Sequence, residues 1–531
     1  MKRSLSLDRV QSAEQPFDIV VIGGGASGLG AAVDAASRGH SVALFEQSDF
    51  AKGTSCKSTK LVHGGVRYLQ QGNVSLVLEA LHERGRLAKN APHLVRSQAF
   101  VIPSYKWWQK HYYGIGMKMY DALAGKLGLE PSRKLSREKT LQAIPTINPD
   151  HLTGGVCYSD GQFDDSRLAV NLAQTAEDLG ASVVNYARCT RILKDNGKVS
   201  GVEIHDLEKD TTFTVKAKVV INATGVFVDD LRKMDEPGSK DIVAVSQGIH
   251  LILPKKFLPG NSAIMIPKTS DGRVLFAVPW HDHVVLGTTD TPLHHKSLEP
   301  RALIEERDFV IAHARKYLTE KPEDDDVCSI FAGLRPLVRA KGDSENTKAL
   351  SRDHTIMISK SGLITLTGGK WTTYRRMAED VINQAEGVGS MEKKECVTKE
   401  MQIHGWTQNK NEQANLAVYG SDASHVKAIS QEDPALAERI HPDLNYQKAE
   451  VIWHAREEMA RTVEDVLSRR TRALLLNAKA SIAAAPVVAQ ILSKELGQDA
   501  QWAAQQVKDY TELAKRYVFT DASSVDDSSH K

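Results

Sequence analysis

Residues 17–46 read FDIVVIGGGASGLGAAVDAASRGHSVALFE, and this stretch decides the fold. A β-rich run, Asp18–Ile22, leads into a glycine-rich turn and then an alanine-rich segment with high helix propensity. A second β-rich run, Val42–Phe45, follows the helical segment. Strand, turn, helix and strand in this order predict the βαβ unit of a Rossmann-type domain, so the fold class is α/β.

The turn carries the spacing G-x-G-x-x-G, and an acidic residue ends the second strand about twenty residues later. The residues are Gly23, Gly25, Gly28 and Glu46, with Ser27 inside the turn. Glycines let backbone amides approach a pyrophosphate at a helix N-terminus, whose partial positive charge favours the anion. The acid is suited to hold ribose hydroxyls. We therefore predict that these residues bind a dinucleotide cofactor.

A later segment, FTVKAKVVINATGVFVDDL at residues 213–231, bears on which dinucleotide is bound. It predicts a strand that ends in Ala223, Thr224 and Gly225. An early βαβ unit completed by a late strand ending in Ala-Thr-Gly resembles the FAD-binding half of the D-amino-acid-oxidase-like flavoproteins. The resemblance favours FAD over NAD and adds these three residues to the expected cofactor site.

The composition excludes several classes of protein. The chain has 531 residues, 41% hydrophobic and 25% charged, which is typical of a globular protein with two or three domains. The formal net charge is +2, with acids and bases interspersed, so no charge pattern indicates nucleic acid. The five cysteines form no Cys-x-x-Cys pair, which fits a reducing compartment and argues against a metal site. We recognise neither a secretion signal nor a membrane-spanning run.

The pattern along the chain predicts three structural regions behind a flexible tail, residues 1–16. We expect the FAD-binding domain to comprise residues 17–240 and 355–388, with insertions. Short β-rich runs in residues 241–354 predict a mainly antiparallel substrate-binding sheet. Helical periodicity over residues 389–531 predicts a C-terminal all-α cap.

A second motif, TSCKSTKLVHGGVRYL at residues 54–69, mixes core-forming residues with a histidine, paired glycines and an arginine. It resembles the signature of the FAD-dependent glycerol-3-phosphate dehydrogenases. Four further segments agree with that family, in the family's order. They are YSDGQFDDSRL (158–168), GTTDTP (287–292), FAGLRPLV (331–338) and LTGGKWTTYRRMAED (366–380). The resemblance therefore extends over nearly the whole chain.

The resemblance implies oxidation of sn-glycerol 3-phosphate to dihydroxyacetone phosphate, with hydride transfer from C2 to FAD. A dianionic phosphate needs cations and forked donors. The expected substrate-binding residues are Arg67, Tyr68, Arg335, Arg352 and Lys370. His63 is the candidate for taking the hydroxyl proton, because imidazole titrates near neutrality, and Arg335 completes the expected catalytic set. Alternatively, His63 only orients the flavin.

The same motifs are expected to supply further FAD contacts. Gly64 and Gly65 would let the backbone approach the isoalloxazine ring. Thr372 or Thr373 would cap a helix whose positive end faces the flavin. The remaining expected FAD-binding residues are Thr54, Ser55, Ser58, Lys60, His63, Gly369 and Lys370.

The electrons must leave the flavin, and the family passes them to membrane quinone or to oxygen. We expect quinone, because residues 105–120, YKWWQKHYYGIGMKMY, interleave aromatic side chains and lysines as at a lipid interface. The alternative for this segment is packing under the helical cap. The expected location is cytoplasmic, at the inner face of the cell membrane, and assembly into a homodimer stays open.

Two other functions are compatible with the same fold. One is a flavin oxidase acting on an amine or amino acid, which would bind a carboxylate and would not need a cluster of cations. The other is a flavin-containing binding protein without turnover. Reduction of the flavin by glycerol 3-phosphate would separate all three.

Overall fold

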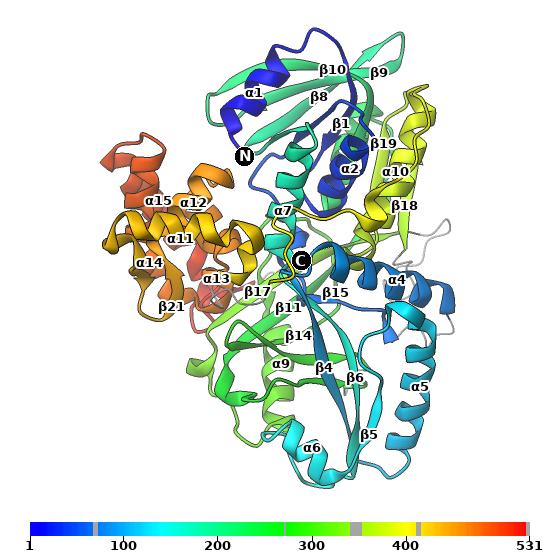
Figure 1. The fold of residues 1–531 in the computed structure, drawn as a ribbon, viewed down its shortest axis with the longest axis vertical. Helices are drawn as coiled ribbons and strands as arrows, with labels where there is room; N and C mark the ends of the chain where they lie inside the picture. Colours follow the sequence, from blue (N-terminus) through cyan, green and yellow to red (C-terminus); the bar gives the residue numbers. More distant parts are fainter. Residues whose placement is uncertain (67–72, 270–271, 340–352, 410–415, 527–531) are drawn as a thin grey trace.

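The computed structural model describes residues 1–66, 73–269, 272–339, 353–409 and 416–526. Two β-sheets lie one above the other along the long axis of the molecule (Figure 1). Helices of the C-terminal region lie to one side of them, on the left in this view.

The upper sheet contains the predicted βαβ unit. Its strands lie in the order β18 (His354–Ile358), β19 (Ile364–Gly368), β10 (Thr211–Asn222), β1 (Phe17–Ile22), β2 (Val42–Phe45) and β7 (Ser182–Val184). All neighbours are parallel except the edge strand β18. The central strands are buried on both faces, which suits their Val- and Ile-rich sequences. Their carboxyl ends therefore meet at one edge, where ligands bind in open α/β sheets.

Three helices pack on this sheet and cover its core. Helix α2 (Ala26–Ser37) follows β1 and packs against α7 (Asp165–Asp178) and α10 (Tyr374–Val388). A β-hairpin, β8 (Ala187–Asp195) and β9 (Lys198–Asp206), extends β10 in antiparallel pairing. The early unit and the late strand thus form one sheet, as predicted.

The lower sheet is mixed and mostly antiparallel. Its strands lie in the order β15 (Thr291–Leu293), β11 (Val243–Pro254), β14 (His283–Gly287), β13 (Leu275–Trp280), β12 (Ala263–Ile266), β4 (Val95–Ser104), β6 (Gly154–Phe163) and β3 (Leu61–Val62). In addition, β17 (Ser329–Val338) pairs with β11, and β5 (Arg133–Leu135) pairs with β6. Helix α9 (Ile304–Tyr317) packs against β11 and β14.

This sheet also contains an insertion of the kind expected within residues 17–240. Residues 61–163 supply β3 to β6, so this part of the expected FAD-binding domain belongs to the second sheet. The parallel pair β12 and β4 joins the early strands to the late ones, with Ile264 opposite Val101. Pairing between strands so distant in sequence leaves no local signal, which is why the pattern along the chain missed it.

The C-terminal region is mainly helical, as predicted, with one small hairpin. It contains α11 (Ala423–Glu432), β20 (Arg439–His441), β21 (Leu444–Gln447), α12 (Lys448–Glu457), a π-helical turn (Asp465–Arg470), α13 (Ala473–Leu476), α14 (Ala478–Glu495) and α15 (Ala500–Lys515). Buried ion pairs join the region to the first sheet. Arg470 donates to both carboxylate oxygens of Asp49, at 2.7 and 2.9 Å, just beyond β2.

The N-terminal segment forms a helix, so the prediction of a flexible tail for residues 1–16 is wrong. Helix α1 (Arg3–Gln11) buries Leu7 and Val10 against the upper sheet. Arg3 donates to Asp206 at 2.7 Å and to the carbonyl of Asn185 at 3.0 Å. These partners lie about two hundred residues away, and they supply the stability that a short, weakly amphipathic sequence lacks alone.

The aromatic segment forms α5 (Gln109–Ala124), which packs against α4 (Val74–Asn90), β4 and β6. Figure 1 shows α5 on the opposite side of the molecule from the C-terminal helices. The alternative that this segment packs under the helical cap is therefore wrong. Within the residues that the structure describes, no helix combines the length and apolarity needed to cross a membrane.

Candidate active site

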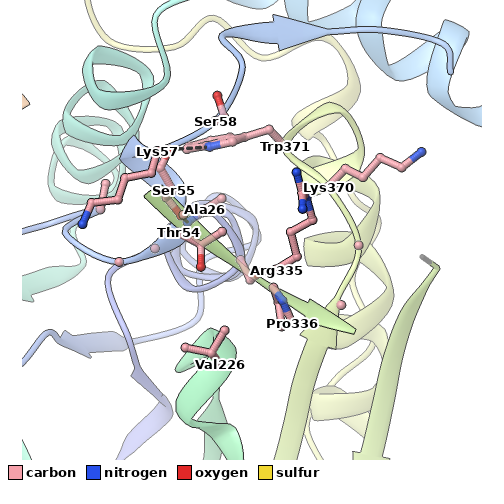
Figure 2. A pocket seen from close by; sticks show the side chains of 18 of the residues that line it. Ala26, Thr54, Ser55, Lys57, Ser58, Val226, Arg335, Pro336, Lys370 and Trp371 are labelled. Carbon is pink, nitrogen blue, oxygen red and sulfur yellow. Dashed lines mark hydrogen bonds between the residues drawn. The ribbon is translucent and has the colours of Figure 1, made fainter. Parts of the chain in front are cut away.

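A cavity of about 820 Å³ lies between the two sheets. The carboxyl ends of β1, β2 and β10 border it on one side, and β4, β6, β11 to β13 and β17 border it on the other. Figure 2 shows Thr54, Ser55 and Lys57 on one side of the opening and Arg335 and Lys370 on the other. The cavity is large enough for a dinucleotide and a small substrate together.

The glycine turn at one end of the cavity has no room for side chains. Gly23 has φ +112°, and a Cβ there would lie 2.6 Å from the Ala223 carbonyl oxygen. A Cβ on Gly28 would lie 1.9 Å from the carbonyl oxygen of Gly23, so Gly28 serves the close packing of α2 on the turn and does not itself line the cavity. Gly25, Ser27, Ala223, Thr224 and Gly225 line the cavity at the N-terminus of α2. This cradle fits a pyrophosphate.

Glu46 borders the same end of the cavity, beyond the last residue of β2. Its carboxylate accepts hydrogen bonds from the amides of Gly24 at 2.7 Å and Ser48 at 2.9 Å. Burial raises the pKa of this carboxyl above its usual range, although the two amides act in the opposite direction. A carboxylate has about four acceptor positions, so capacity remains for ribose hydroxyls. Glu46 and the cradle together fit the adenosine half of FAD.

The segment after β2 contributes three of its expected hydroxyl residues to the cavity wall. Thr54 donates to the carbonyl of Leu334 at 2.6 Å, and Ser55 accepts from the Ala26 amide at 3.0 Å. Ser58 also lines the cavity, but its hydroxyl donates to Asp165 at 2.7 Å. These hydroxyls therefore make hydrogen bonds to other residues of the protein, which fix the conformation of the cavity wall.

Lys60 does not line the cavity, which corrects its prediction as an FAD-binding residue. Its ammonium is fully buried and donates to both oxygens of Asp165, at 2.7 and 2.8 Å, and to the Cys56 carbonyl at 2.6 Å. Its backbone has a positive φ of 63°, immediately before β3 begins at Leu61. A buried lysine is retained when it is paired and hydrogen-bonded, and Asp165 at the start of α7 provides the charge.

His63 and Gly65 line the cavity, whereas Gly64 faces the opposite way. A Cβ on Gly64 would lie 2.4 Å from both the Tyr120 hydroxyl and Leu81. The expected close approach of the backbone to the isoalloxazine ring is therefore available at Gly65 only. Gly64 is needed for packing behind the segment.

Arg335 projects from β17 into the cavity, toward the turn that carries Lys370 (Figure 2). Its guanidinium donates to the carbonyls of Thr289 at 2.9 Å and Gln247 at 3.2 Å, and lies 3.4 Å from Asp290. A Cβ at position 248 would lie 2.1 Å from the guanidinium, so Gly248 makes room for it. The arginine is thus held in one orientation.

Several other predicted residues can be located relative to the cavity. Gly369, Lys370 and Thr372 line the cavity, and Thr373 does not. Three predicted substrate residues, Arg67, Tyr68 and Arg352, lie outside the described residues.

The predicted threonine cap of α10 is absent. Thr373 precedes the helix, but its hydroxyl donates to the Lys370 carbonyl at 3.3 Å and accepts no hydrogen bond from an amide of the first turn. The Thr372 hydroxyl accepts from the His63 amide at 3.2 Å. A 3-10 turn, Trp371–Thr373, leads directly into the helix, and of the two threonines only Thr372 lines the cavity.

His250 is a cavity residue that the sequence reasoning missed. It lies on β11, is 2% exposed, and stacks on Phe331 with ring centroids 4.9 Å apart. Its Nε2 is 2.9 Å from the Thr59 hydroxyl, and its Nδ1 has no hydrogen-bond partner among the described residues. Burial, together with the charges of Arg335 and Lys60, holds its pKa well below the usual value. The only sequence signal was a lone histidine in the apolar run GIHLILP.

Two family profiles match this chain. The profile described as FAD dependent oxidoreductase matches residues 18–375. The profile described as the C-terminal domain of alpha-glycerophosphate oxidase matches residues 361–503. The first match covers both sheets and the cavity, and the second covers most of the helical region.

Three known proteins that match nearly the whole chain are glycerol-3-phosphate dehydrogenases by name. The mitochondrial glycerol-3-phosphate dehydrogenase of Rattus norvegicus is 38% identical over 97% of this chain and 75% of its own length. The mitochondrial glycerol-3-phosphate dehydrogenase of Arabidopsis thaliana is 37% identical over 97% of this chain and 87% of its own length. The crystal structure of the glycerol-3-phosphate dehydrogenase from Bacillus halodurans, complexed with FAD, matches with a TM-score of 0.79 at 29% identity, over 97% of this chain and 98% of its own.

The L-alpha-glycerophosphate oxidase of Mycoplasma pneumoniae, at 17% identity and a TM-score of 0.56 over 74% of this chain and 100% of its own, is similar in fold alone. The cradle and the buried acid fit FAD, and the matches agree on the cofactor and on the enzyme class. The chain therefore belongs to the FAD-dependent oxidoreductases and, among them, to the family of glycerol-3-phosphate dehydrogenases.

Proposed function

We propose that this protein oxidises sn-glycerol 3-phosphate to dihydroxyacetone phosphate and passes the electrons to a membrane quinone. The observation that carries the proposal is an oriented arginine, Arg335, and a buried histidine, His250, whose pKa burial lowers, in one wall of the FAD cavity. FAD, when bound, supplies the acceptor for two electrons from the substrate carbon. The family name of the full-length relatives supports the same substrate.

Arg335 is proposed to hold the substrate phosphate. The contacts of its guanidinium to two carbonyl oxygens fix the plane of the fork, which reduces the entropy lost when a phosphate binds. Lys370, on the neighbouring turn, would add a second positive charge. An amine or amino-acid substrate would not require two cations here.

His63 is proposed to take the proton of the C2 hydroxyl, and His250 is a second candidate. The lowered pKa keeps the His250 imidazole in the neutral form that can accept a proton, but it also makes His250 the weaker base of the two. The substitutions His63→Asn and His250→Asn separate the two. The variant that has lost the base should show a much lower limiting rate of flavin reduction. If that base is His63, the rate should also lose its dependence on pH between pH 5 and pH 8, the range in which imidazoles ordinarily titrate.

The substrate assignment is tested with Arg335→Ala. Loss of one charge-assisted contact, roughly 2–4 kcal/mol, should lower kcat/KM for glycerol 3-phosphate by about 30-fold to nearly a thousandfold. The same substitution should not lower the much weaker reaction with glycerol. Arg191→Ala, at a surface pair with Glu203, is the control and should behave as wild type. Equal losses on both substrates would remove Arg335 from the phosphate site.

The proposed route to quinone depends on the outer face of α5 and the residues just before it. Exposed apolar side chains form a row there, which we call the α5 patch: Trp107, Trp108, Tyr112, Ile115 and Met119. Lysines flank the row, so the patch has the composition that binds the headgroup region of an anionic bilayer. Peripheral attachment at the inner face of the cell membrane would bring the enzyme to a lipid-soluble acceptor.

Liposome sedimentation and turnover assays test this part separately. Wild type should sediment with anionic vesicles at low salt and reduce a short-chain quinone faster than it reduces oxygen. Trp107→Ser with Ile115→Ser should abolish sedimentation, whereas Ile358→Ser, an exposed apolar residue on β18, should not. A wild-type protein that stays in the supernatant and forms peroxide at its full rate would be an oxidase, the alternative suggested by the name of the C-terminal profile.

A further inference from the structure

One residue of the surface helix α5 reaches the segment that borders the FAD cavity. Tyr120 is 2% exposed and lies behind residues 63–65, on the side away from the cavity. Its hydroxyl oxygen accepts a hydrogen bond from the Gly64 amide at 2.8 Å. This contact joins positions 56 residues apart. Among the described residues, it is the hydrogen bond that the Gly64 amide makes.

The proton of the Tyr120 hydroxyl has a fixed direction. It is donated to the Oδ2 atom of Asp160 at 2.7 Å, while the Oδ1 atom accepts from Arg84 at 2.9 Å and from the Gly161 amide at 3.1 Å. Arg84 is 2% exposed, so the carboxylate is paired inside the protein. With its proton committed to Asp160, the hydroxyl can only accept from Gly64. The donations from Gly64 through Tyr120 and from Arg84 therefore both end at the Asp160 carboxylate.

The space behind Gly64 is filled, so the Tyr120 hydroxyl also limits how far residues 63–65 can move away from the cavity. A Cβ at this position would lie 2.4 Å from the Tyr120 oxygen and 2.4 Å from Leu81. On the cavity side, the neighbouring His63 amide donates to the Thr372 hydroxyl at 3.2 Å. The segment is therefore held from two directions, by α5 behind it and by the turn before α10 in front of it.

We propose that Tyr120 is a positioning residue that fixes the His63–Gly65 segment at the wall of the FAD cavity. It touches neither substrate nor the cavity, and it acts through the Gly64 amide on the two neighbours that line the wall. The inference rests on the FAD site given by the family, and its kinetic test rests in addition on the proposed substrate. The surface helix proposed to meet lipid is thus also a support of the active site.

The test compares Tyr120→Phe with Tyr113→Phe in the purified holoenzyme. Both substitutions remove one hydroxyl from α5, and Tyr113 lies two turns earlier on the same helix, packed against the same apolar cluster. Tyr120→Phe leaves the Gly64 amide buried without an acceptor, so the segment should shift. Tyr113→Phe should leave all measured properties unchanged.

We expect Tyr120→Phe to change the visible absorption spectrum of the bound flavin and to lower the limiting rate of its anaerobic reduction about tenfold, with half-saturation by glycerol 3-phosphate unchanged. FAD content should equal that of wild type. A spectrum and rate like those of Tyr113→Phe would overturn the proposal. So would a lower rate that only follows losses of FAD content and thermal stability, since that is a structural effect.

Two further results keep the outcomes separate. If Tyr120→Phe does not yield holoenzyme, Asp160→Asn keeps the ring and removes the charge that orients the hydroxyl, and it should reproduce the spectral change and the lower rate. If wild type is not reduced by glycerol 3-phosphate, the proposed function fails, but the spectral comparison of the two tyrosine variants still decides the role of Tyr120.

Discussion

Replacing Glu46 by glutamine should weaken FAD binding without unfolding the protein. The carboxylate accepts from two amides, those of Gly24 and Ser48, and a glutamine side chain has one acceptor oxygen. One amide would then face an NH2 group, and the ribose would lose a charged acceptor. Loss of one hydrogen bond to a charged group costs roughly 1.5–3 kcal/mol, which predicts about 10- to 150-fold weaker binding.

The assay is titration of apoprotein with FAD, followed by the change in flavin fluorescence. Asp210→Asn is the control, because this carboxylate is 93% exposed and does not line the cavity. Both variants should unfold at the wild-type temperature to within a few degrees. The reasoning about the buried acid is refuted if Glu46→Gln binds FAD with wild-type affinity.

Two further predictions concern stability. Arg470→Met leaves the Asp49 carboxylate without its bidentate partner, although Arg469 still contacts it. The free energy of unfolding, measured in urea, should fall by about 3–5 kcal/mol. An unchanged unfolding transition would mean that apolar packing alone holds the helical region. Burial lowers the pKa of His404, but its contacts to Asp178 at 2.6 Å and Asp422 at 2.9 Å outweigh burial and raise it to about 9. Because the folded-state pKa is raised, its stabilisation is complete below about pH 6.5 and is lost as pH rises through about 9, so the melting temperature should fall over that range. His404→Asn should remove most of this fall, and an identical slope in that variant would contradict it.

The sequence predicted the βαβ unit and the FAD cofactor because the motif that indicates them is local. Residues 17–46 contain the strand, turn, helix and acid, and each requirement acts within a few residues of the next. The FAD cofactor, the two-sheet fold with a helical region and the family are confirmed by the profiles and by the solved structure. The roles of individual site residues stay predictions.

The errors arose where distant segments decide the structure. Lys60 stands in a cofactor motif, but Asp165, more than a hundred residues later, captures its charge inside the protein. His250 has no motif of its own and reaches the cavity through the register of β11 with β17. Gly64 resembles a residue that makes room for a ligand, yet it makes room for Tyr120. Long-range pairing of this kind has no signature in a single sequence.

Anaerobic mixing of the purified flavoprotein with glycerol 3-phosphate tests the central claim most directly. The account predicts that glycerol 3-phosphate bleaches the visible absorption of the bound flavin completely, and that glycerol, sarcosine and D-amino acids do not. Bleaching by an amine or amino acid in its place would assign the cavity to another substrate class. If none of these compounds reduces the flavin, the proposal that the protein oxidises glycerol 3-phosphate is contradicted, although its family membership is not affected.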